Sequence, residues 1–364
     1  MQLEREICMG CCRCGKFRWA TGAALLLMLL CVSGVVHAGV GTVNDLFDIS
    51  FANEKDGWSC GRWGTVLRTS DGGRTWTAQE SGTDYTLSSI FFVDTVHGWA
   101  VGDEGTILHT DDGGATWNRQ VPPDVNVQTA RRWGDTGWSD KKKTKPLTSF
   151  LMGVHFADAR TGWIVTERTT ILNTVDGGKT WSVQFSDEDF VLRSISFCDD
   201  THGWAVGEYG YIYHTHDGGK TWEHQAGYFD ISEETGELIG ENFLFDVAAV
   251  SPKRAWVVGI DGFVSRTDDG GKTWQRITEG VPKTHLFGIC ATDTDTVLIS
   301  GNALLLYSRD GGASFSRATA DPAITYGWLY DITARGRAGF AAAGKEGWIY
   351  LTGKEIASWK LGGN

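Results

Sequence analysis

Six aspartates occupy near-identical surroundings along this chain, and recurring carboxylates are candidates for acid–base or metal chemistry. Each belongs to an eight-residue phrase of Thr/Ser, any residue, Asp, Gly, Gly, any residue, Thr/Ser and Trp/Phe, which we call the Asp-box. The box aspartates are Asp71, Asp112, Asp176, Asp217, Asp269 and Asp310. A site built six times is poorly suited to one reaction, so we interpret these carboxylates as structural. The two glycines permit unusual backbone angles, and Asp in a turn accepts bonds from nearby N–H groups.

Three other aspartates share one position in a recurring apolar phrase, two residues after its initial Leu: Asp48, Asp246 and Asp331. If the repeats form a ring, these carboxyls approach a central channel and could form a cluster with raised pKa values, as a glycosidase requires. The other repeats have Ser or Gly there, which favours small polar residues filling a narrow channel. The chain has no His-Glu-x-x-His, phosphate-loop or nucleophile-elbow motif. We therefore predict no catalytic residue, no metal and no cofactor.

The Asp-boxes recur at separations of 41, 64, 41, 52 and 41 residues, so the unit is 41 residues long with two longer connections. The unit from Leu87 to Gln120 contains four short runs rich in β-branched and aromatic residues, separated by Gly and Asp turns. No sustained helical period follows the first 38 residues. Each unit is predicted to be four antiparallel strands, with the Asp-box joining the third strand to the fourth.

The apolar phrase that opens the unit can be aligned seven times. Its initial residues are Leu46, Leu87, Leu151, Leu192, Leu244, Leu286 and Leu329. Seven four-stranded units predict an all-β, seven-bladed β-propeller with Asp-box turns, formed by residues 39–364 as one domain. A six-bladed ring and an open β-solenoid are the alternatives.

Residues 1–38 differ from the remainder. Basic residues precede an apolar segment from Ala20 to Val36, and Ala38 ends a stretch of small residues that suits cleavage. The pattern predicts a secretory signal peptide, with an uncleaved N-terminal membrane anchor as the alternative. We expect an exported protein, periplasmic or extracellular, attached to the membrane if the segment is retained. The net charge of −12 disfavours nucleic acid as a partner.

Five tryptophans lie outside the repeat pattern. In a propeller, the turn between strands two and three shares a face with the connection from strand four to the next blade. We call this the upper face, and the Asp-boxes then lie on the lower face. All five map to the upper face: Trp63, Trp133, Trp138, Trp328 and Trp348. Aromatic residues outside the core pattern indicate an interaction surface, whereas the alternative is that they cap the channel and shield the blade ends.

Two insertions also emerge on the upper face, at about 121–147 and 226–242. The first is basic, with a net charge of +3, and the second is acidic, with a net charge of −5. The basic candidates for partner binding are Arg131, Arg132, Lys141, Lys142 and Lys143. Opposite local charges can steer and orient a partner, whereas the alternative is that the lysine run is a solvated loop.

The Asp-box (BNR) units resemble those of sialidases, sortilin-type receptors and xyloglucan-degrading enzymes. The longer phrase from Leu87 through Gly98-Trp99 and Gly105 to Thr110 is more specific. It resembles the photosystem II stability/assembly-factor family of chloroplasts and cyanobacteria, with its bacterial relatives. The resemblance covers about residue 44 to the C-terminus. It implies a seven-bladed, non-enzymatic, exported propeller that aids assembly of a membrane complex. The family's arginine-rich patch has its nearest candidates here in Arg131 and Arg132.

The sequence therefore predicts an exported scaffold that binds protein partners of the envelope or of a membrane complex through its upper face. The alternative is a carbohydrate-binding or glycoside-hydrolysing propeller that uses Trp63, Trp328 and Trp348 as a sugar platform. An Arg-Ile-Pro phrase, expected of sialidases, is absent, and xyloglucanases resemble two fused propellers of about twice this length.

Overall fold

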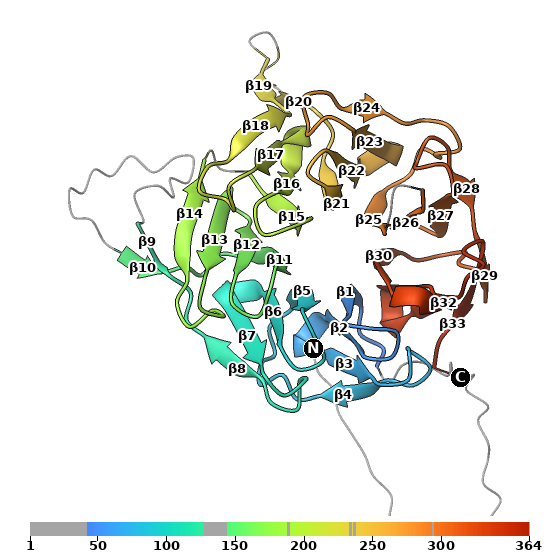
Figure 1. The fold of residues 1–364 in the computed structure, drawn as a ribbon, viewed down its shortest axis with the longest axis horizontal. Coiled ribbons are helices and arrows are strands. Elements are labelled where there is room, and N and C mark those ends of the chain that lie inside the picture. The colour runs from blue at the N-terminus through green and yellow to red at the C-terminus, as the bar shows by residue number, and fades with distance from the viewer. Residues whose placement is uncertain are drawn as a thin grey trace, which may run out of the picture. The chain divides into compact units, whose positions relative to one another are not determined.

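The computed structural model describes residues 42–126, 144–187, 190–232, 235, 238–292 and 295–363, and residues 38–364 form one compact unit. Seven antiparallel sheets surround a central axis (Figure 1). The predicted seven-bladed propeller is confirmed, and the six-bladed and solenoid alternatives are wrong. Each of the seven predicted leucines begins the innermost strand of a blade.

Each of the first four blades contains four strands that are consecutive along the chain. Blade 1 is β1 (Leu46–Phe51), β2 (Gly57–Gly61), β3 (Val66–Thr69) and β4 (Thr77–Gln79). Blade 2 is β5 (Leu87–Phe92), β6 (Gly98–Gly102), β7 (Thr106–Thr110) and β8 (Asn118–Gln120). Blade 3 is β11 (Leu151–Phe156), β12 (Gly162–Thr166), β13 (Thr170–Thr174) and β14 (Ser182–Ser186). Blade 4 is β15 (Leu192–Phe197), β16 (Gly203–Gly207), β17 (Ile212–Thr215) and β18 (Glu223–Ala226).

The last three blades repeat the order, and the final one gains a strand. Blade 5 is β21 (Leu244–Ser251), β22 (Arg254–Gly259), β23 (Phe263–Thr267) and β24 (Gln275–Arg276). Blade 6 is β25 (Leu286–Ala291), β26 (Val297–Gly301), β27 (Leu304–Ser308) and β28 (Ser316–Arg317). Blade 7 is β30 (Leu329–Ala334), β31 (Phe340–Gly344), β32 (Ile349–Thr352) and β33 (Ser358–Leu361), and β29 (Thr319–Asp321) pairs with β33 in parallel.

Short elements join these strands. Single helical turns follow second strands at η1 (Arg62–Gly64), η2 (Asp103–Gly105), η4 (Glu208–Gly210), η5 (Ile260–Gly262) and η7 (Lys345–Gly347). Another turn, η6 (Gly336–Ala338), joins β30 to β31. The two insertions contain small hairpins of β9 (Asp124–Asn126) with β10 (Thr144–Pro146), and β19 (Phe229–Ile231) with β20 (Leu238–Gly240).

Aromatic trios fill the interfaces between the first four blades. Trp99 of blade 2 stacks on Phe156 of blade 3, with ring centroids 3.5 Å apart, and Trp181 meets the same Phe edge-on at 5.9 Å. Equivalent trios are Trp58–Phe92–Trp117 and Trp163–Phe197–Trp222. The indole N–H of Trp99 also donates to the carbonyl of Gly177 in the next Asp-box, at 3.3 Å. These second-strand tryptophans are buried, so the core runs around the ring between blades.

Size is matched across the first two strands of every blade. Phe92 is paired with Gly98, and a Cβ atom on Gly98 would lie 2.3 Å from the Phe92 ring. The same Phe–Gly pair occurs in blades 1, 3 and 4. In blades 5, 6 and 7 the pairs are Ala249–Ala255, Ala291–Val297 and Ala334–Phe340. Two large side chains therefore never face each other, and in six of the seven blades a larger side chain faces a smaller one.

The ring closes without exchange of a strand, because blades 1 and 7 are each built from one end of the chain. In blade 7, Ala341 stands where blades 1 to 5 have Trp and blade 6 has Leu298, and the Arg335 guanidinium lies 5.9 Å from the Phe51 ring centroid. The buried Arg335 side chain donates to the carbonyl oxygens of Gly72, Ala338, Phe340 and Thr352. The buried Arg335 side chain is therefore hydrogen-bonded to backbone carbonyl groups, and its bond to Gly72 links blade 7 to blade 1.

In the part of the chain that the structure describes, no helix is both long and apolar enough to span a bilayer. The predicted leader, residues 1–38, lies outside the described residues. Its interpretation as a signal peptide or anchor therefore stays a prediction.

Candidate functional site

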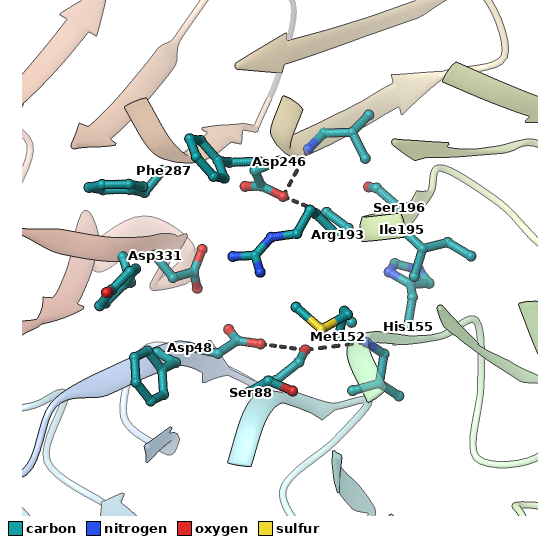
Figure 2. Close-up of a pocket in the computed structure, with 18 of the residues that line it drawn as sticks. Asp48, Ser88, Met152, His155, Arg193, Ile195, Ser196, Asp246, Phe287 and Asp331 are labelled. Atoms are coloured by element: carbon teal, nitrogen blue, oxygen red, sulfur yellow. Dashed lines mark hydrogen bonds between the residues drawn. The ribbon is translucent and has the colours of Figure 1, made fainter. Parts of the chain in front are cut away.

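The first strands of all seven blades enclose a central channel of about 960 Å³ (Figure 2). Every first strand has a register shift between its first and third residues, as between Leu87 and Ser89. A bulge of this kind redirects a side chain. The second residues of the strands line the channel, and they are Phe47, Ser88, Met152, Arg193, Phe245, Phe287 and Tyr330.

Four of these residues form a continuous aromatic arc at the upper ends of their strands. Phe245 lies 5.3 Å from Phe287, Phe287 lies 5.3 Å from Tyr330, and Tyr330 lies 4.9 Å from Phe47, all between ring centroids. The arc covers blades 5, 6, 7 and 1, whereas blades 2 and 3 contribute Ser88 and Met152. One side of the channel is therefore more aromatic than the other.

Arg193 continues the aromatic arc into blade 4. Its guanidinium carbon lies 5.7 Å from the Phe245 ring centroid, and the side chain projects into the channel (Figure 2). Among the described residues it makes no hydrogen bond and no ion pair. Burial lowers the pKa of Arg193, and the nearby Tyr330 and Glu208 oppose that shift. The channel therefore contains a cation beside aromatic rings, with hydrogen-bonding capacity left unused.

The three channel aspartates hold neighbouring blades together. Asp48 of blade 1 accepts the Ser89 hydroxyl at 2.6 Å and the Ile90 N–H at 2.8 Å, both from blade 2. Asp331 of blade 7 accepts the Ile49 N–H of blade 1 at 3.1 Å and is hydrogen-bonded to the Asp48 carboxyl. Two carboxyl groups can bond in this way only when they share a proton. Burial and then the Asp48 charge raise the pKa of Asp331 well above its usual value.

Asp246 makes the same kind of link on the opposite side of the ring. It accepts the Ser194 hydroxyl of blade 4 at 2.6 Å and the Ile289 N–H of blade 6 at 2.8 Å. Burial raises its pKa to about 6, against the effect of these bonds. The raised pKa values expected of the channel aspartates are therefore present. Each of the three carboxyl groups accepts at least one hydrogen bond from another blade, which gives it a structural use that does not require a substrate.

The turns of the upper face use one backbone shape with different side chains. Six of them place a non-glycine residue in the left-handed region: Trp63, Glu104, Tyr209, Asp261, Ala303 and Glu346, with φ between 53° and 57°. This conformation costs about 1–2 kcal/mol for an L-residue. Trp63 is 70% exposed in that strained position. The turn also forms with Ala or Glu, so folding does not require an indole there.

Trp328 and Trp348 share the upper face with Trp63 but not its exposure. Both are half-buried, and the ammonium nitrogen of Lys345 lies 5.6 and 5.8 Å from their ring centroids. Trp348 also packs closely on Gly327, where a Cβ atom would lie 2.7 Å from its ring. Of the three predicted sugar-platform tryptophans, only Trp63 offers an open face. A platform made from all three stays a prediction.

The remaining predicted partner-binding residues lie outside the described residues. They are Arg131, Arg132, Trp133, Trp138, Lys141, Lys142 and Lys143. Their role stays a prediction. The described ends of the two insertions, hairpins β9–β10 and β19–β20, join strand four of one blade to strand one of the next, which is a connection of the upper face.

Exposed aromatic side chains are confined to the upper face among the described residues. They are Trp63, Tyr85, Phe150, Tyr228 and Tyr326, with exposed fractions from 44% to 84%. Each lies in a connection that the strand order assigns to that face. The exposed apolar residues of the lower turns are Val96 and Val175. Exposed aromatic surface of this kind marks a binding face.

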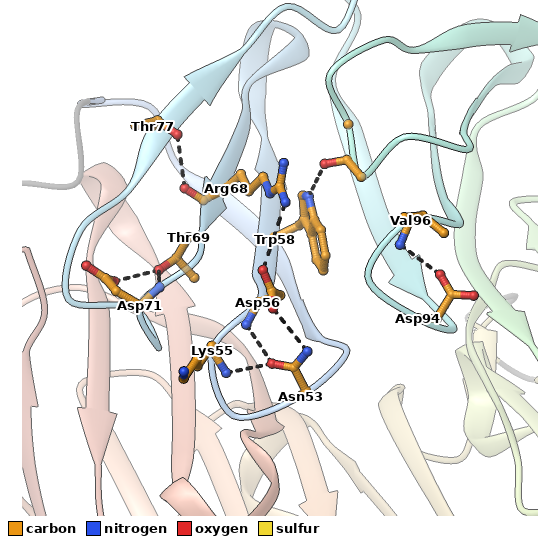
Figure 3. Close-up of polar contacts among 12 residues, drawn as sticks. Asn53, Lys55, Asp56, Trp58, Arg68, Thr69, Asp71, Thr77, Asp94 and Val96 are labelled. Atoms are coloured by element: carbon orange, nitrogen blue, oxygen red, sulfur yellow. Dashed lines mark hydrogen bonds and ion pairs between the residues drawn. The ribbon is translucent and has the colours of Figure 1, made fainter.

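The Asp-boxes form closed turns on the lower face, and Figure 3 shows the one around Asp71. The Asp71 carboxylate accepts bonds from the Thr69 hydroxyl, the Thr75 N–H and the Thr75 hydroxyl at 2.7–2.9 Å. The same bonds recur in the other five boxes. In Asp112 the hydroxyl and N–H of Thr116 lower the pKa to about 2. Among the described residues, no group of three or more His, Cys, Asp or Glu side chains is placed to hold a metal.

Sequence reasoning missed the aromatic arc and Arg193. The signal was the second position of the seven aligned first strands, where the residue changes from blade to blade while its neighbours repeat. Ordinary strand alternation would have placed that residue on the same side as the buried fourth position. The shared bulge changes its direction.

Comparison with known proteins gives a consistent family and fold. The sequence pattern of the family described as "Photosynthesis system II assembly factor YCF48" matches residues 36–128, 134–226 and 231–362. A photosystem II assembly lipoprotein Ycf48 of Synechococcus sp. (strain CC9902) is 30% identical over 118 residues. That match covers 32% of this chain and 35% of the relative, about a third of its length.

Two solved structures share the fold at low sequence identity. A structure titled "YCF48 bound to D1 peptide" is 21% identical, with a TM-score of 0.64 over 85% of this chain and 94% of that one. The GH74 enzyme of Niastella koreensis is 14% identical, with a TM-score of 0.64 over 89% of this chain and 55% of the enzyme. The propeller architecture is therefore common to a binding protein and an enzyme, and the fold alone does not choose between them.

Proposed function

This chain belongs to the photosynthesis system II assembly factor YCF48 family, and we propose that it is a non-enzymatic, exported propeller that binds protein partners through its upper face. The partners we infer are proteins of the envelope or of a membrane complex. The relatives support this, because one is named an assembly lipoprotein and another is solved with a D1 peptide. This role needs a binding surface and no reacting group.

The observation that carries the proposal is the contrast in aromatic exposure between the two faces. Upper-face connections expose five aromatic side chains, and the channel beside them holds the aromatic arc and Arg193. Aromatic and arginine side chains are the groups that contribute most at protein interfaces. In the Asp-box turns of the lower face, the polar groups form hydrogen bonds inside the turn. Among the described residues, the lower turns expose no aromatic ring.

The non-enzymatic reading has its own support. The three channel aspartates are bonded between blades, and the pair Asp48–Asp331 is tied up in a shared proton. A retaining or inverting glycosidase needs two carboxyl groups free to act on the sugar. His155 also lines the channel. Burial lowers its pKa to about 4, so the imidazole is uncharged at pH 7.

Site-specific crosslinking tests the proposal. A photoreactive phenylalanine analogue is introduced into the full-length chain at Tyr326 or Phe150 on the upper face. The matched controls carry it at Val175 or Val96 on the lower face, which are similarly exposed. In the native host, we expect upper-face positions to crosslink the same membrane or envelope proteins and lower-face positions to crosslink none of them. Equal crosslinking from both faces would contradict the proposal.

A further inference from the structure

A second pocket lies on the upper face of blade 1, away from the central channel. It has a volume of about 380 Å³ and opens beside Trp63, between η1, the segment before β1 and the connection that follows β4. A pocket of this size accommodates a small ligand or the end of a chain-like one. The channel site and the proposed protein-binding role do not account for it.

The pocket is polar apart from the indole. Hydroxyl groups come from Thr42, Thr65, Ser81 and Thr83, an amide from Asn44, and carboxylates from Glu80 and Asp84, whereas the Gln79 amide donates to the Gly113 carbonyl of blade 2. The aliphatic residues that line it are Val66, Leu67 and Ala78, of which the first two are buried in the blade. A protein partner that docks by apolar anchors would find one aromatic surface here and no second apolar wall.

Internal bonds hold part of this lining in place. The Asn44 amide nitrogen donates to the Thr65 hydroxyl at 2.9 Å, and that hydroxyl donates to the Arg62 carbonyl at 2.6 Å. The Asn44 amide oxygen is thereby left as an acceptor at the pocket. Ser81 is fixed in the same way, since its hydroxyl donates to the Thr83 carbonyl at 3.2 Å. The polar groups are therefore positioned before any ligand arrives, which reduces the entropy cost of binding.

The two carboxylates have acceptor capacity to spare. Glu80 and Asp84 are exposed, and neither makes an ion pair or a side-chain hydrogen bond with a described residue. Together with Asn44 they offer several acceptors to a ligand rich in hydroxyl groups. Two unpaired carboxylates also disfavour any anionic ligand, including a phosphate, a uronate or a sialate.

The indole supplies the remaining element. Trp63 exposes most of its surface in a strained backbone position that other turns fill with Ala, Glu or Asp. An unpacked aromatic ring beside fixed polar groups matches the two-sided chemistry of a pyranose. The C–H face of the sugar stacks on the ring, and its hydroxyls bond to amide and carboxylate oxygens.

We infer that the Trp63 pocket of blade 1 is a binding site for a neutral saccharide. It is separate from the channel, so one face of the propeller carries two recognition sites of different chemistry. The inference does not depend on the protein-binding role, because Trp63 is the one residue that the pocket lining shares with the exposed aromatic set of that role.

Calorimetric titration of the full-length chain tests this with defined probes: cellotetraose, chitotetraose and maltotetraose as neutral ligands, and tetragalacturonate as the anionic one. We expect at least one neutral tetrasaccharide to bind and tetragalacturonate to bind at least tenfold more weakly. Trp63→Ala should weaken the neutral interaction at least tenfold, and Asp84→Asn should weaken it severalfold.

The matched control is Tyr209→Ala. Tyr209 occupies the same left-handed turn position in blade 4, so its removal should leave saccharide binding unchanged. Thermal unfolding of each variant establishes that the fold is retained. The inference is overturned if none of the three neutral probes binds, if Trp63→Ala binds as the unmodified chain does, or if tetragalacturonate binds equally well. Loss of a crosslinked protein in Trp63→Ala, without saccharide binding by the unmodified chain, would likewise overturn it and would assign this pocket to a protein.

Discussion

The interface between blades 2 and 3 and the seam between blades 7 and 1 occupy equivalent places in the ring but are closed by different chemistry. At the first, Trp99, Phe156 and Trp181 stack, and the hydrogen bonds beside them, such as those from the Trp99 indole and the Gln120 amide to the Gly177 carbonyl, join no ionisable groups. At the seam, Arg335 donates to four carbonyl oxygens and Asp331 shares a proton with Asp48. The stability gained from apolar stacking depends on the apolar area that is buried and little on pH. The stability of the seam depends on the direction of its hydrogen bonds and on the protonation of its carboxyl groups.

The largest expected effect comes from removing an aromatic ring between two blades. Trp99→Ala leaves a buried cavity at the centre of a trio and should lower the free energy of unfolding by about 4 kcal/mol. Urea unfolding followed by circular dichroism measures this. The change should be nearly the same at pH 5 and pH 8. If the loss of stability in Trp99→Ala depended strongly on pH, the proposed difference between this interface and the seam would be wrong.

Arg335→Ala should come next. The substitution leaves carbonyl oxygens at the seam without donors and removes the guanidinium from the Phe51 ring, for about 3 kcal/mol of lost stability. Arg335→Lys restores the charge and one or two donors but not the planar fork, so it should recover part of the loss. If Arg335→Lys is as stable as the unmodified protein, the multiple bonds of the guanidinium do not matter to the seam.

The size match between paired strands predicts a compensating pair of substitutions. Gly98→Ala pushes a Cβ atom against the Phe92 ring and should destabilise the protein by about 2 kcal/mol. In a Phe92→Ala background, which copies the Ala249–Ala255 pair of blade 5, the same change should cost little. A double-mutant cycle by denaturant unfolding gives the coupling. Additive effects would show that the pairing of sizes is incidental.

The channel carboxyls, Asp331 at the seam and Asp246 on the opposite side of the ring, should also give stability a pH dependence, because their pKa values are raised in the folded protein. Folding then takes up protons, so the stabilisation is complete below about pH 4. It is lost as the pH rises through about 6 for Asp246 and through higher values for Asp331. From pH 4 to 8 these carboxyls therefore contribute a fall in the free energy of unfolding, whereas buried His155 and His214, each with its pKa lowered to about 4, contribute a rise between about pH 4 and 6.5.

Two variants separate the channel carboxyls from the others. Asp331→Asn, which keeps a donor toward Asp48, should flatten the fall in stability. Asp112→Asn should leave its slope unchanged, because hydrogen bonds from Thr116 hold the Asp112 pKa at about 2, below this window. An unchanged slope in Asp331→Asn would assign the pH dependence to other groups.

The smallest stability effect is expected at the surface. Trp63→Ala removes an exposed ring from a turn that other blades form without one, so the free energy of unfolding should change by less than about 0.5 kcal/mol. Thermal unfolding of the variant measures this. A larger loss of stability would show that the indole has a structural role, and it would weaken the assignment of Trp63 to ligand binding.

The fold could be predicted because it follows the repeat, whereas the contacts that depart from the repeat could not be predicted. The seven leucines and six Asp-boxes recur with their neighbours, so strand starts and turns followed from the sequence. Arg335 stands in no repeated phrase, and its contact with Phe51 joins residues at opposite ends of the chain. The proton shared by Asp48 and Asp331 also depends on ring closure. Alignment of repeats reveals what blades have in common, whereas contacts that one pair of blades makes alone require coordinates.

Because every blade is completed by its own consecutive strands, the protein is modular at the level of its gene. Duplication or loss of one 41-residue stretch would add or remove a whole blade without leaving a strand unpaired. Circular permutation is open for the same reason: new termini can be cut in a connection on the upper face, and the old ones can be joined by a linker. The seam chemistry would then lie between two covalently continuous blades, where it would become one more interface.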